Sequence, residues 1–186
     1  MKNTNHSLFD KYEMIKDLGT GSSGSVTLVR HISMDQERAL KKVPKASAFA
    51  ESALSEARLL KSLEHPSIPR IFDFEEDNAF YYIVEEYIDG ETLDSFLLHQ
   101  QLISPGLFFN ICEQLCNVFI YLHTQISTPI IYRDLKPEHI IVCHNKLKLI
   151  DFGVSAYVIQ DGNNFNHYGN IAVSYTHLRA HETVLD

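Results

Sequence analysis

The chain has 186 residues, of which 45% are hydrophobic and 22% are charged, and its formal net charge at pH 7 is −8. This composition indicates a globular protein and excludes a disordered chain, while the acidic balance argues against general binding to nucleic acid. The length is sufficient for one sizeable hydrophobic core or two small ones.

The sequence carries no pattern typical of secretion or of membrane insertion. Residues 1–9 lack an apolar signal region, and no apolar run approaches membrane-spanning length. Cys112 and Cys116 lie one helical turn apart and Cys143 is remote, so the three cysteines form neither a disulfide framework nor a zinc-ligand spacing. We therefore expect a cytoplasmic protein with no membrane segment and no nucleic-acid partner.

The first part of the chain is predicted to be a small antiparallel sheet with one helix. Alternating apolar residues bounded by turn residues predict strands over residues 12–18, 26–30, 38–43, 71–74 and 80–85. Apolar residues at helical spacing predict a helix over residues 49–63, which His65 and Pro66 end.

The second part begins at a change of composition over Ile88-Asp89-Gly90, which predicts a hinge. Residues 92–99 predict a short helix, and Ser104 followed by Pro105 predicts the start of a long one, because serine is a good N-cap and proline is favoured at the first helical position. The apolar stripe expected to make this helix the centre of the second part consists of Phe108, Ile111, Leu115, Val118, Phe119 and Leu122.

Two short strands, over residues 140–142 and 147–150, are predicted around a turn at Asn145. This hairpin would bring two acidic residues to one point: Asp134, before the first strand, and Asp151, after the second. One carboxylate could then face an attacking hydroxyl while the other holds a metal on the phosphate being moved. The predicted fold class is α+β with two lobes, of which the second is incomplete.

A glycine-rich segment, Gly19-Thr20-Gly21-Ser22-Ser23-Gly24-Ser25-Val26, joins the first two predicted strands. Glycines let the backbone lie close over phosphates and offer N–H groups to them, although three glycines are also common in a tight hairpin turn. Because the segment joins strand to strand and not strand to helix, a dinucleotide-binding fold is disfavoured.

In this order the glycine segment, Lys41, the run Ile131-Tyr132-Arg133-Asp134-Leu135-Lys136-Pro137-Glu138-His139 and Asp151-Phe152-Gly153 match the signature set of the protein kinases. From about Tyr12 to about Ala172 the chain resembles a eukaryotic-type (Hanks-type) Ser/Thr protein kinase of a bacterial kind. The resemblance implies a bilobal protein-kinase-like fold, with an N-terminal extension over residues 1–11, an N-lobe over 12–88 and a partial helical C-lobe over 89–172.

Residues 173–186 resemble no kinase segment, and the Ala-Pro-Glu segment expected shortly after Ala172 is absent. We interpret them as a non-native tail of translated adapter sequence at a broken end; the alternative is a divergent natural tail. The chain is then expected to be a truncated, inactive fragment of a kinase, in which the long helix exposes part of its apolar stripe.

The resemblance implies how ATP would be held. Lys41 would bind the α- and β-phosphates and Glu56 would pair with Lys41, while the competing acids Glu51 and Glu64 would face solvent. Strand periodicity puts Ala39 and Lys41 on one face and Leu40 and Lys42 on the other, so Lys42 is expected in solvent. The remaining expected nucleotide-binding positions are Gly19, Gly21, Gly24, Val26, Ala39, Glu86, Ile88 and Ile141.

Two acids and a lysine carry the catalytic step that the resemblance implies. Asp134 would accept the proton of the substrate hydroxyl, Lys136 would steady the γ-phosphate, and Asp151 would hold Mg²⁺ on the phosphates. Tyr132 would lie in an apolar column with Phe152, and Arg133 would pair with a phosphorylated activation segment.

Two positions depart from the kinase pattern. Glu85 stands where the family has an apolar or threonine side chain, and it either contacts a neighbouring polar group or reflects a one-residue alignment slip. His139 replaces the asparagine that would bind a second metal, and its nitrogen suits a hard cation less well. Three interpretations of His139 are open. The enzyme could work mainly through the metal ion on Asp151, it could prefer Mn²⁺, or the protein could be a pseudokinase.

Three functions remain open at this point. The first is an enzyme that transfers the γ-phosphoryl group of ATP to Ser or Thr of proteins whose identity the sequence does not name. The second is a pseudokinase that binds nucleotide as a scaffold, which His139 favours. The third is a small-molecule phosphotransferase, which the glycine segment and the Arg-Asp-Leu-Lys-Pro run disfavour.

Overall fold

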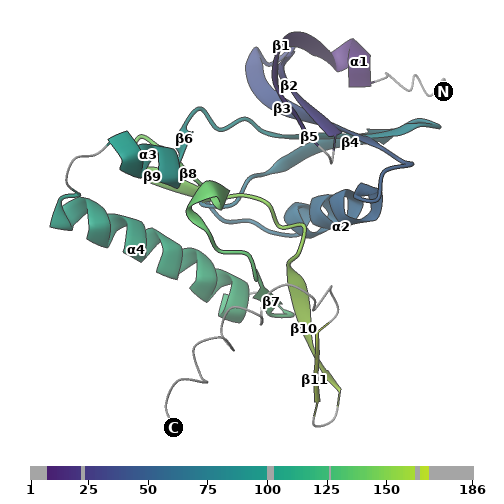
Figure 1. The fold of residues 1–186 in the computed structure, drawn as a ribbon. Helices are drawn as coiled ribbons and strands as arrows, with labels where there is room; N and C mark the ends of the chain where they lie inside the picture. The colour runs from purple at the N-terminus through teal and green to yellow at the C-terminus, as the bar shows by residue number, and fades with distance from the viewer. Residues whose placement is uncertain (1–7, 22–23, 100–102, 126, 162–163, 168–186) are drawn as a thin grey trace, which may run out of the picture. The chain divides into compact units, whose positions relative to one another are not determined.

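The computed structural model describes residues 8–21, 24–99, 103–125, 127–161 and 164–167 (Figure 1). The chain divides into two compact units, Met1–Gly90 and Glu91–Asp186. Strands and helices occur in both units, which confirms the expected α+β class. Each unit is described by itself.

The first unit is built on a five-stranded antiparallel sheet with the order β1-β2-β3-β5-β4. Its strands are β1 (Tyr12–Gly21), β2 (Gly24–His31), β3 (Gln36–Pro44), β4 (Ile71–Glu76) and β5 (Phe80–Glu86). All five strands were predicted from the sequence, and β1 and β2 extend further into the glycine segment than expected.

Side-chain alternation along β3 divides the core of this unit between the two faces of the sheet. Helix α2 (Ala50–Lys61) lies along one face (Figure 1), where Ala53 and Ala57 pack against Val43 and Ile83. On the other face a second cluster consists of Leu8, Tyr12, Val29, Leu40, Tyr82 and Val84. Helix α2 ends earlier than predicted, because the Ser62 hydroxyl donates to the Leu59 carbonyl at 2.7 Å.

The short helix α1 (Leu8–Lys11) was not predicted from the sequence. Leu8 is only 1% exposed and belongs to the second cluster, and its N–H donates to the Glu75 carboxylate at 2.5 Å. Lys11 forms an ion pair with Asp73 of β4 at 2.7 Å. The segment before β1 is therefore tied to the edge strand of the sheet by one buried side chain and two polar contacts.

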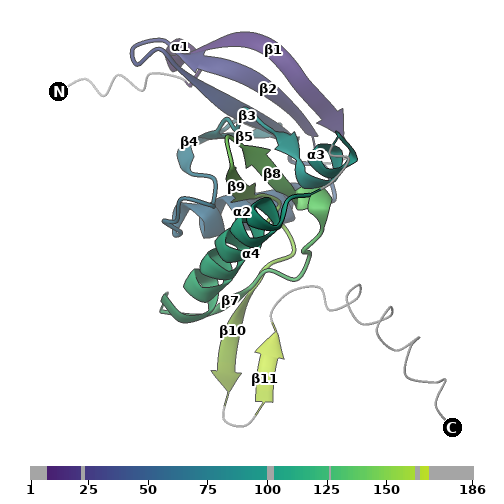
Figure 2. The ribbon, with the colours of Figure 1, turned by 90° about the vertical axis from the view of Figure 1, so that its left-hand side faces the viewer.

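The second unit contains the helices α3 (Leu93–His99) and α4 (Pro105–Ile120), and α4 continues into a π-helical turn over Tyr121–Gln125. One three-stranded sheet has the order β6-β8-β9 and the other β11-β10-β7. Both views show the β10–β11 hairpin extending away from α4 (Figures 1 and 2). The strands are β6 (Glu91–Thr92), β7 (Ile130–Ile131), β8 (Ile140–Cys143), β9 (Lys146–Leu149), β10 (Ala156–Asp161) and β11 (Asn164–His167).

Helix α4 begins as predicted, with the Ser104 side chain accepting a hydrogen bond from the Leu107 N–H at 3.2 Å. Its apolar stripe is buried only toward the C-terminal end, where Val118 and Leu122 are fully buried. Phe108 at the other end is 53% exposed. The expectation that the whole stripe forms the centre of this unit is therefore wrong for its first turn, whereas the expected partial exposure is confirmed.

Gln114 of α4 holds the β8–β9 hairpin through the two ends of its side-chain amide. The amide nitrogen donates to the Asn145 carbonyl at 2.9 Å, and the amide oxygen accepts from the Leu147 N–H at 2.9 Å. His144 and Asn145 adopt positive φ angles of 47° and 62°, as residues of a tight turn do. The helix thus fixes the turn that joins the two strands.

We predict that Gln114→Ala lowers the free energy of unfolding by about 1–3 kcal/mol, because it leaves the N–H of the buried Leu147 without its acceptor. Urea denaturation of the full chain measures the change. The matched control is Glu113→Ala, an exposed neighbour on the same helix. Equal denaturation midpoints for the two variants would contradict the anchoring role.

Candidate active site

The glycine segment behaves differently at its two ends. A Cβ atom on Gly24, whose φ is 138°, would lie 2.1 Å from the carbonyl oxygen of Lys42, so only glycine fits against β3. A Cβ on Gly19 or Gly21 would meet no atom within 4 Å. The backbone at Gly19 and Gly21 therefore borders open space in which phosphate groups could lie. Residues 22 and 23, which lie between Gly21 and Gly24, fall outside the described part.

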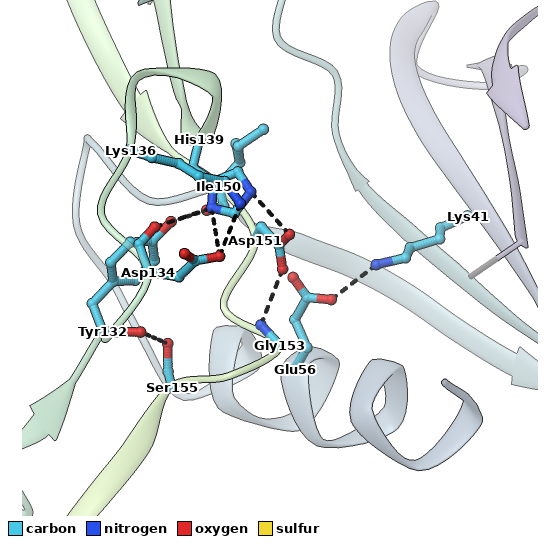
Figure 3. A network of polar contacts seen from close by, with 10 residues as sticks. All are labelled: Lys41, Glu56, Tyr132, Asp134, Lys136, His139, Ile150, Asp151, Gly153 and Ser155. Carbon is cyan, nitrogen blue, oxygen red and sulfur yellow. Dashed lines mark hydrogen bonds and ion pairs between the residues drawn. The ribbon is translucent and has the colours of Figure 1, made fainter. Parts of the chain in front are cut away.

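Lys41 forms the ion pair that the sequence predicted. Its Nζ lies 2.8 Å from Oε2 of Glu56, with the two side chains 21% and 11% exposed (Figure 3). Val26 lies directly opposite Lys41 on β2, and Leu28 lies opposite Ala39, so Val26, Ala39 and Lys41 share the sheet face that α2 covers. Glu51 and Glu64 are exposed, as expected for the competing acids.

Lys42 points to the opposite face, but the expectation that it is surrounded by solvent is wrong. Its ammonium lies 4.0 Å from the centre of the Phe80 ring and 5.9 Å from that of Tyr82. The side chain is half-buried, because its aliphatic stem covers the aromatic cluster on that face. Lys41 and Lys42 are thus held by different neighbours on different faces.

The segment after β5 carries the predicted hinge positions Glu86 and Ile88. The N–H of Glu86 donates to the Arg70 carbonyl at 2.9 Å, and its carboxylate accepts from the Arg70 N–H at 3.3 Å. The carbonyl of Ile88 accepts from the Gly90 N–H at 3.0 Å. These contacts fix the backbone in this part of the first unit.

Glu85 lies on β5 directly opposite Ala39 on one side and Ile71 on the other. Its side chain is partly exposed, but protein surrounds the carboxyl group, and this burial raises the pKa of Glu85 to about 7. The positive charge of Lys41 acts against this rise in pKa and the negative charge of Glu56 adds to it.

In the second unit His139 lies between the two predicted acids (Figure 3). Its Nδ1 is 3.1 Å from the backbone oxygen of Asp134 and 3.4 Å from Oδ2 of the same residue. Its Nε2 is 3.3 Å from Oδ2 of Asp151. Both ring nitrogens therefore face oxygen acceptors, and the sequence did not predict this bridge.

Lys136 lies 3.1 Å from Oδ2 of Asp134, so the proposed base has a lysine and a histidine as neighbours. A turn of 3₁₀ helix over Pro137–His139 carries the imidazole back toward Asp134. Asp151 has a positive φ of 60°, which is uncommon for a residue with a side chain and typical of constrained sites.

Tyr132 fixes the strand end that precedes Asp134. It is 2% exposed, packs edge to face against Phe152 at 5.0 Å and donates its hydroxyl hydrogen bond to the Ile150 carbonyl (Figure 3). The Ser155 hydroxyl donates to the Tyr132 carbonyl at 3.2 Å. Arg133, with a positive φ of 69°, donates to the Val154 carbonyl from Nε at 2.6 Å and also from NH2.

A divalent metal fits this region at Asp151. Its side chain is 53% exposed, and carboxylate oxygens are the donors that Mg²⁺ prefers. No group of three or more His, Cys, Asp or Glu side chains is arranged to hold a metal within the described residues. A nitrogen that binds a metal carries no proton, so His139 could bind an ion through Nε2 only if this nitrogen donates no hydrogen bond to Asp151. Ile141, a predicted nucleotide contact, is half-buried on β8, between Thr92 of β6 and Lys148 of β9.

Gln114 is the positioning residue that sequence reasoning missed. A signal was present, since it is a polar residue one position before Leu115 of the apolar stripe.

None of the helices in the described part of the chain is long and apolar enough to cross a membrane.

The family model described as "Protein kinase domain" matches residues 12–178, which include the first positions beyond Ala172. The chain is 31% identical over 150 residues to serine/threonine-protein kinase PrkC of Bacillus subtilis, covering 78% of this chain and 23% of that protein. It is 35% identical over 172 residues to calcium-dependent protein kinase 4 of Plasmodium falciparum, covering 84% of this chain and 31% of the relative.

A third relative, cAMP-dependent protein kinase type 3 of Saccharomyces cerevisiae, is 35% identical over 158 residues, with 82% of this chain and 39% of the yeast protein covered. The chain thus spans well under half the length of each of these relatives.

We predict that Glu85→Gln stabilises the chain at pH 8 and has little effect at pH 4.5. The folded pKa of about 7 lies above the ordinary value of 4.5, so the stability linked to the protonated carboxyl is present below pH 4.5 and lost as pH rises through 7. The relative gain between the two pH values is about 2–3 kcal/mol. Urea denaturation measures it, with the exposed Glu51→Gln as control, and parallel pH profiles for wild type and Glu85→Gln would contradict the burial of this carboxyl.

Proposed function

This chain belongs to the protein kinase family, and we propose that the full-length protein is an ATP-dependent protein serine/threonine kinase. The observation that carries the proposal is the ion pair between Lys41 and Glu56, which holds the lysine proposed to bind the phosphates. The Arg-Asp-Leu-Lys-Pro motif that contains Lys136 and the serine/threonine kinases among the relatives support Ser and Thr as acceptors.

The first unit would supply most of the nucleotide contacts. Glu56 holds the ammonium of Lys41 in place, so this charge is oriented before the phosphates arrive. A Cβ at Gly19 or Gly21 would meet no atom within 4 Å, so phosphate groups would have room to approach the backbone there. The proposed adenine contacts are the side chains of Val26, Ala39 and Ile141 and the backbone of Glu86 and Ile88.

The second unit would supply the groups for transfer. Asp134 would accept the proton of the acceptor hydroxyl. The oxygen of that hydroxyl would attack the γ-phosphorus, while the bond between the γ-phosphorus and the oxygen of the β-phosphate breaks. Lys136, held 3.1 Å from Asp134, would offer its ammonium to the γ-phosphate. A divalent ion, for which we propose Mg²⁺ on Asp151, supplies charge neutralisation on the phosphate oxygens.

The contact between His139 and Asp151 favours one metal ion over two. With the imidazole 3.3 Å from Oδ2, that carboxylate oxygen already has a neighbour, and the position offers nitrogen where a hard cation prefers oxygen. A preference for Mn²⁺ and a pseudokinase that binds nucleotide without turnover are the alternatives, and the same bridge supports the pseudokinase as the second candidate function.

The organisation of the protein is also proposed. Residues 12–88 would be the N-lobe and 89–172 part of the C-lobe, with 1–11 an extension and 173–186 a non-native tail. Free thiols at Cys112, Cys116 and Cys143 support a cytoplasmic location. The partners proposed are ATP and protein substrates.

For the full-length protein, Asp134→Asn should lower kcat by a factor on the order of 10²–10⁴ and change the Kd of an ATP analogue little, because the base acts on the acceptor hydroxyl. Asp151→Asn should also weaken nucleotide binding in the presence of Mg²⁺. Transfer of labelled γ-phosphate to a Ser/Thr peptide library and fluorescence binding measure the two effects.

Lys41→Met should abolish phosphate transfer, because it removes the ammonium proposed to bind the phosphates. The same transfer assay measures this, with Lys42→Met as the control. Equal losses of transfer in the two variants would refute the roles given to the two lysines.

His139→Asn should raise turnover with Mg²⁺ several-fold and reduce any preference for Mn²⁺, because asparagine offers a side-chain oxygen to a hard cation. Initial rates of phosphate transfer in each metal measure this. If His139→Asn restores no turnover with either metal in an inactive protein that still binds nucleotide, the pseudokinase function replaces the enzymatic one.

A further inference from the structure

One ammonium and two carboxyl groups share the face of the first sheet that α2 covers. Lys41 of β3 pairs with Glu56 of α2 at 2.8 Å. Glu85 of β5 lies opposite Ala39, which is two residues before Lys41 on the same strand face. Lys41 and Glu85 are therefore diagonal neighbours across the β3–β5 pair, at a typical separation of about 7–8 Å.

The surroundings of Glu85 contain few other charges. Its opposite neighbour on β4 is the apolar Ile71, and on β3 it is the apolar Ala39. The charged groups that act on its carboxyl are Lys41, which favours the ionised form, and Glu56, which disfavours it. Burial is the main cause of the raised pKa of Glu85, and the two charges that modify it are Lys41, which is proposed to bind the nucleotide phosphates, and Glu56, which holds Lys41.

We propose that Glu85 competes with the phosphates of the nucleotide for Lys41, so that its charge state sets how tightly the site binds a nucleoside triphosphate. With Glu85 ionised, one ammonium and two carboxylates give the trio a net charge of one negative unit, which repels the phosphates. With Glu85 protonated, the trio is neutral and the ammonium of Lys41 interacts with one carboxylate, that of Glu56. This inference rests on the proposed nucleotide binding and identifies Glu85 as a determinant of its affinity.

The charge of Glu85 changes within the physiological range, because burial brings its pKa to about 7. The carboxyl is largely protonated at pH 6 and largely ionised at pH 8, so affinity for nucleotide falls as pH rises. One unit charge at about 8 Å from a phosphate, with an effective dielectric constant of 20–40, changes affinity about tenfold. The phosphates of ATP also titrate, which makes comparison with Glu85→Gln at each pH necessary.

The test measures the Kd of the full-length protein for a fluorescent ATP analogue at fixed Mg²⁺ at pH 6 and pH 8, in wild type and in Glu85→Gln. The ratio of the wild-type Kd to the variant Kd should be near one at pH 6 and about tenfold higher at pH 8. Glu37→Gln, an exposed residue of the same strand β3, should show the wild-type profile.

Parallel profiles for wild type and Glu85→Gln, with measurable binding by both, would overturn this inference and leave nucleotide binding intact. Absence of binding by both proteins at both pH values would overturn the proposed function and this inference together.

A second measurement follows the carboxyl carbons of labelled glutamates by NMR without nucleotide. Lys41→Met should raise the pKa of Glu85 and Glu56→Gln should lower it, because each removes one of the two charges that act on it. If the pKa of Glu85 is the same in wild type, Lys41→Met and Glu56→Gln, the proposed coupling of Glu85 to Lys41 and Glu56 is overturned.

Discussion

The Lys41–Glu56 pair is the interaction on which the proposed phosphate-binding half of the molecule depends, and it exists because the helix comes close to the sheet. The helix presents Ala53 and Ala57 to Val43 and Ile83, and these small side chains allow an approach that a larger residue would prevent. Glu56 can then reach across to β3 and meet the lysine at 2.8 Å. Packing of small apolar side chains thus determines where the charge of Lys41 is held.

The second unit holds its reactive groups in a different way, since both acids follow short strands and Asp151 has a positive φ angle. Gln114 fixes the turn of the β8–β9 hairpin, whose strands lie between His139 and Asp151, and Tyr132 connects the catalytic loop to Phe152 and Ile150. The positive φ angles of Arg133 and Asp151 are held within this frame. His139 then joins Asp134 to Asp151, so a change at any of the three alters the other two.

Periodic patterns were sufficient to predict the five strands of the first sheet, the two longer helices and the choice of Lys41 over Lys42, because alternation and helical spacing are local properties. The pairing with Glu56 was predicted from the resemblance to the protein kinases, because Glu56 stands where the helix of that family carries the partner of the lysine. What lay beyond prediction depends on contacts between residues far apart in the chain. The aromatic neighbours of Lys42, the burial of Leu8, the anchoring by Gln114 and the bridge through His139 all arise only when separate segments meet. The length of the buried stripe on α4 was overestimated for the same reason.

The tie between α1 and the edge of the first sheet affects how this protein should be trimmed for expression. Similarity to the family begins at residue 12, so a gene cut at that position would keep every residue of the family match and every proposed nucleotide contact. It would also remove Leu8 from its pocket beside Tyr82 and Val84, a side chain whose burial contributes about 2 kcal/mol. The ion pair of Lys11 with Asp73 would be lost as well. A tag or cleavage site is therefore better placed before Leu8 than at the edge of the recognisable domain.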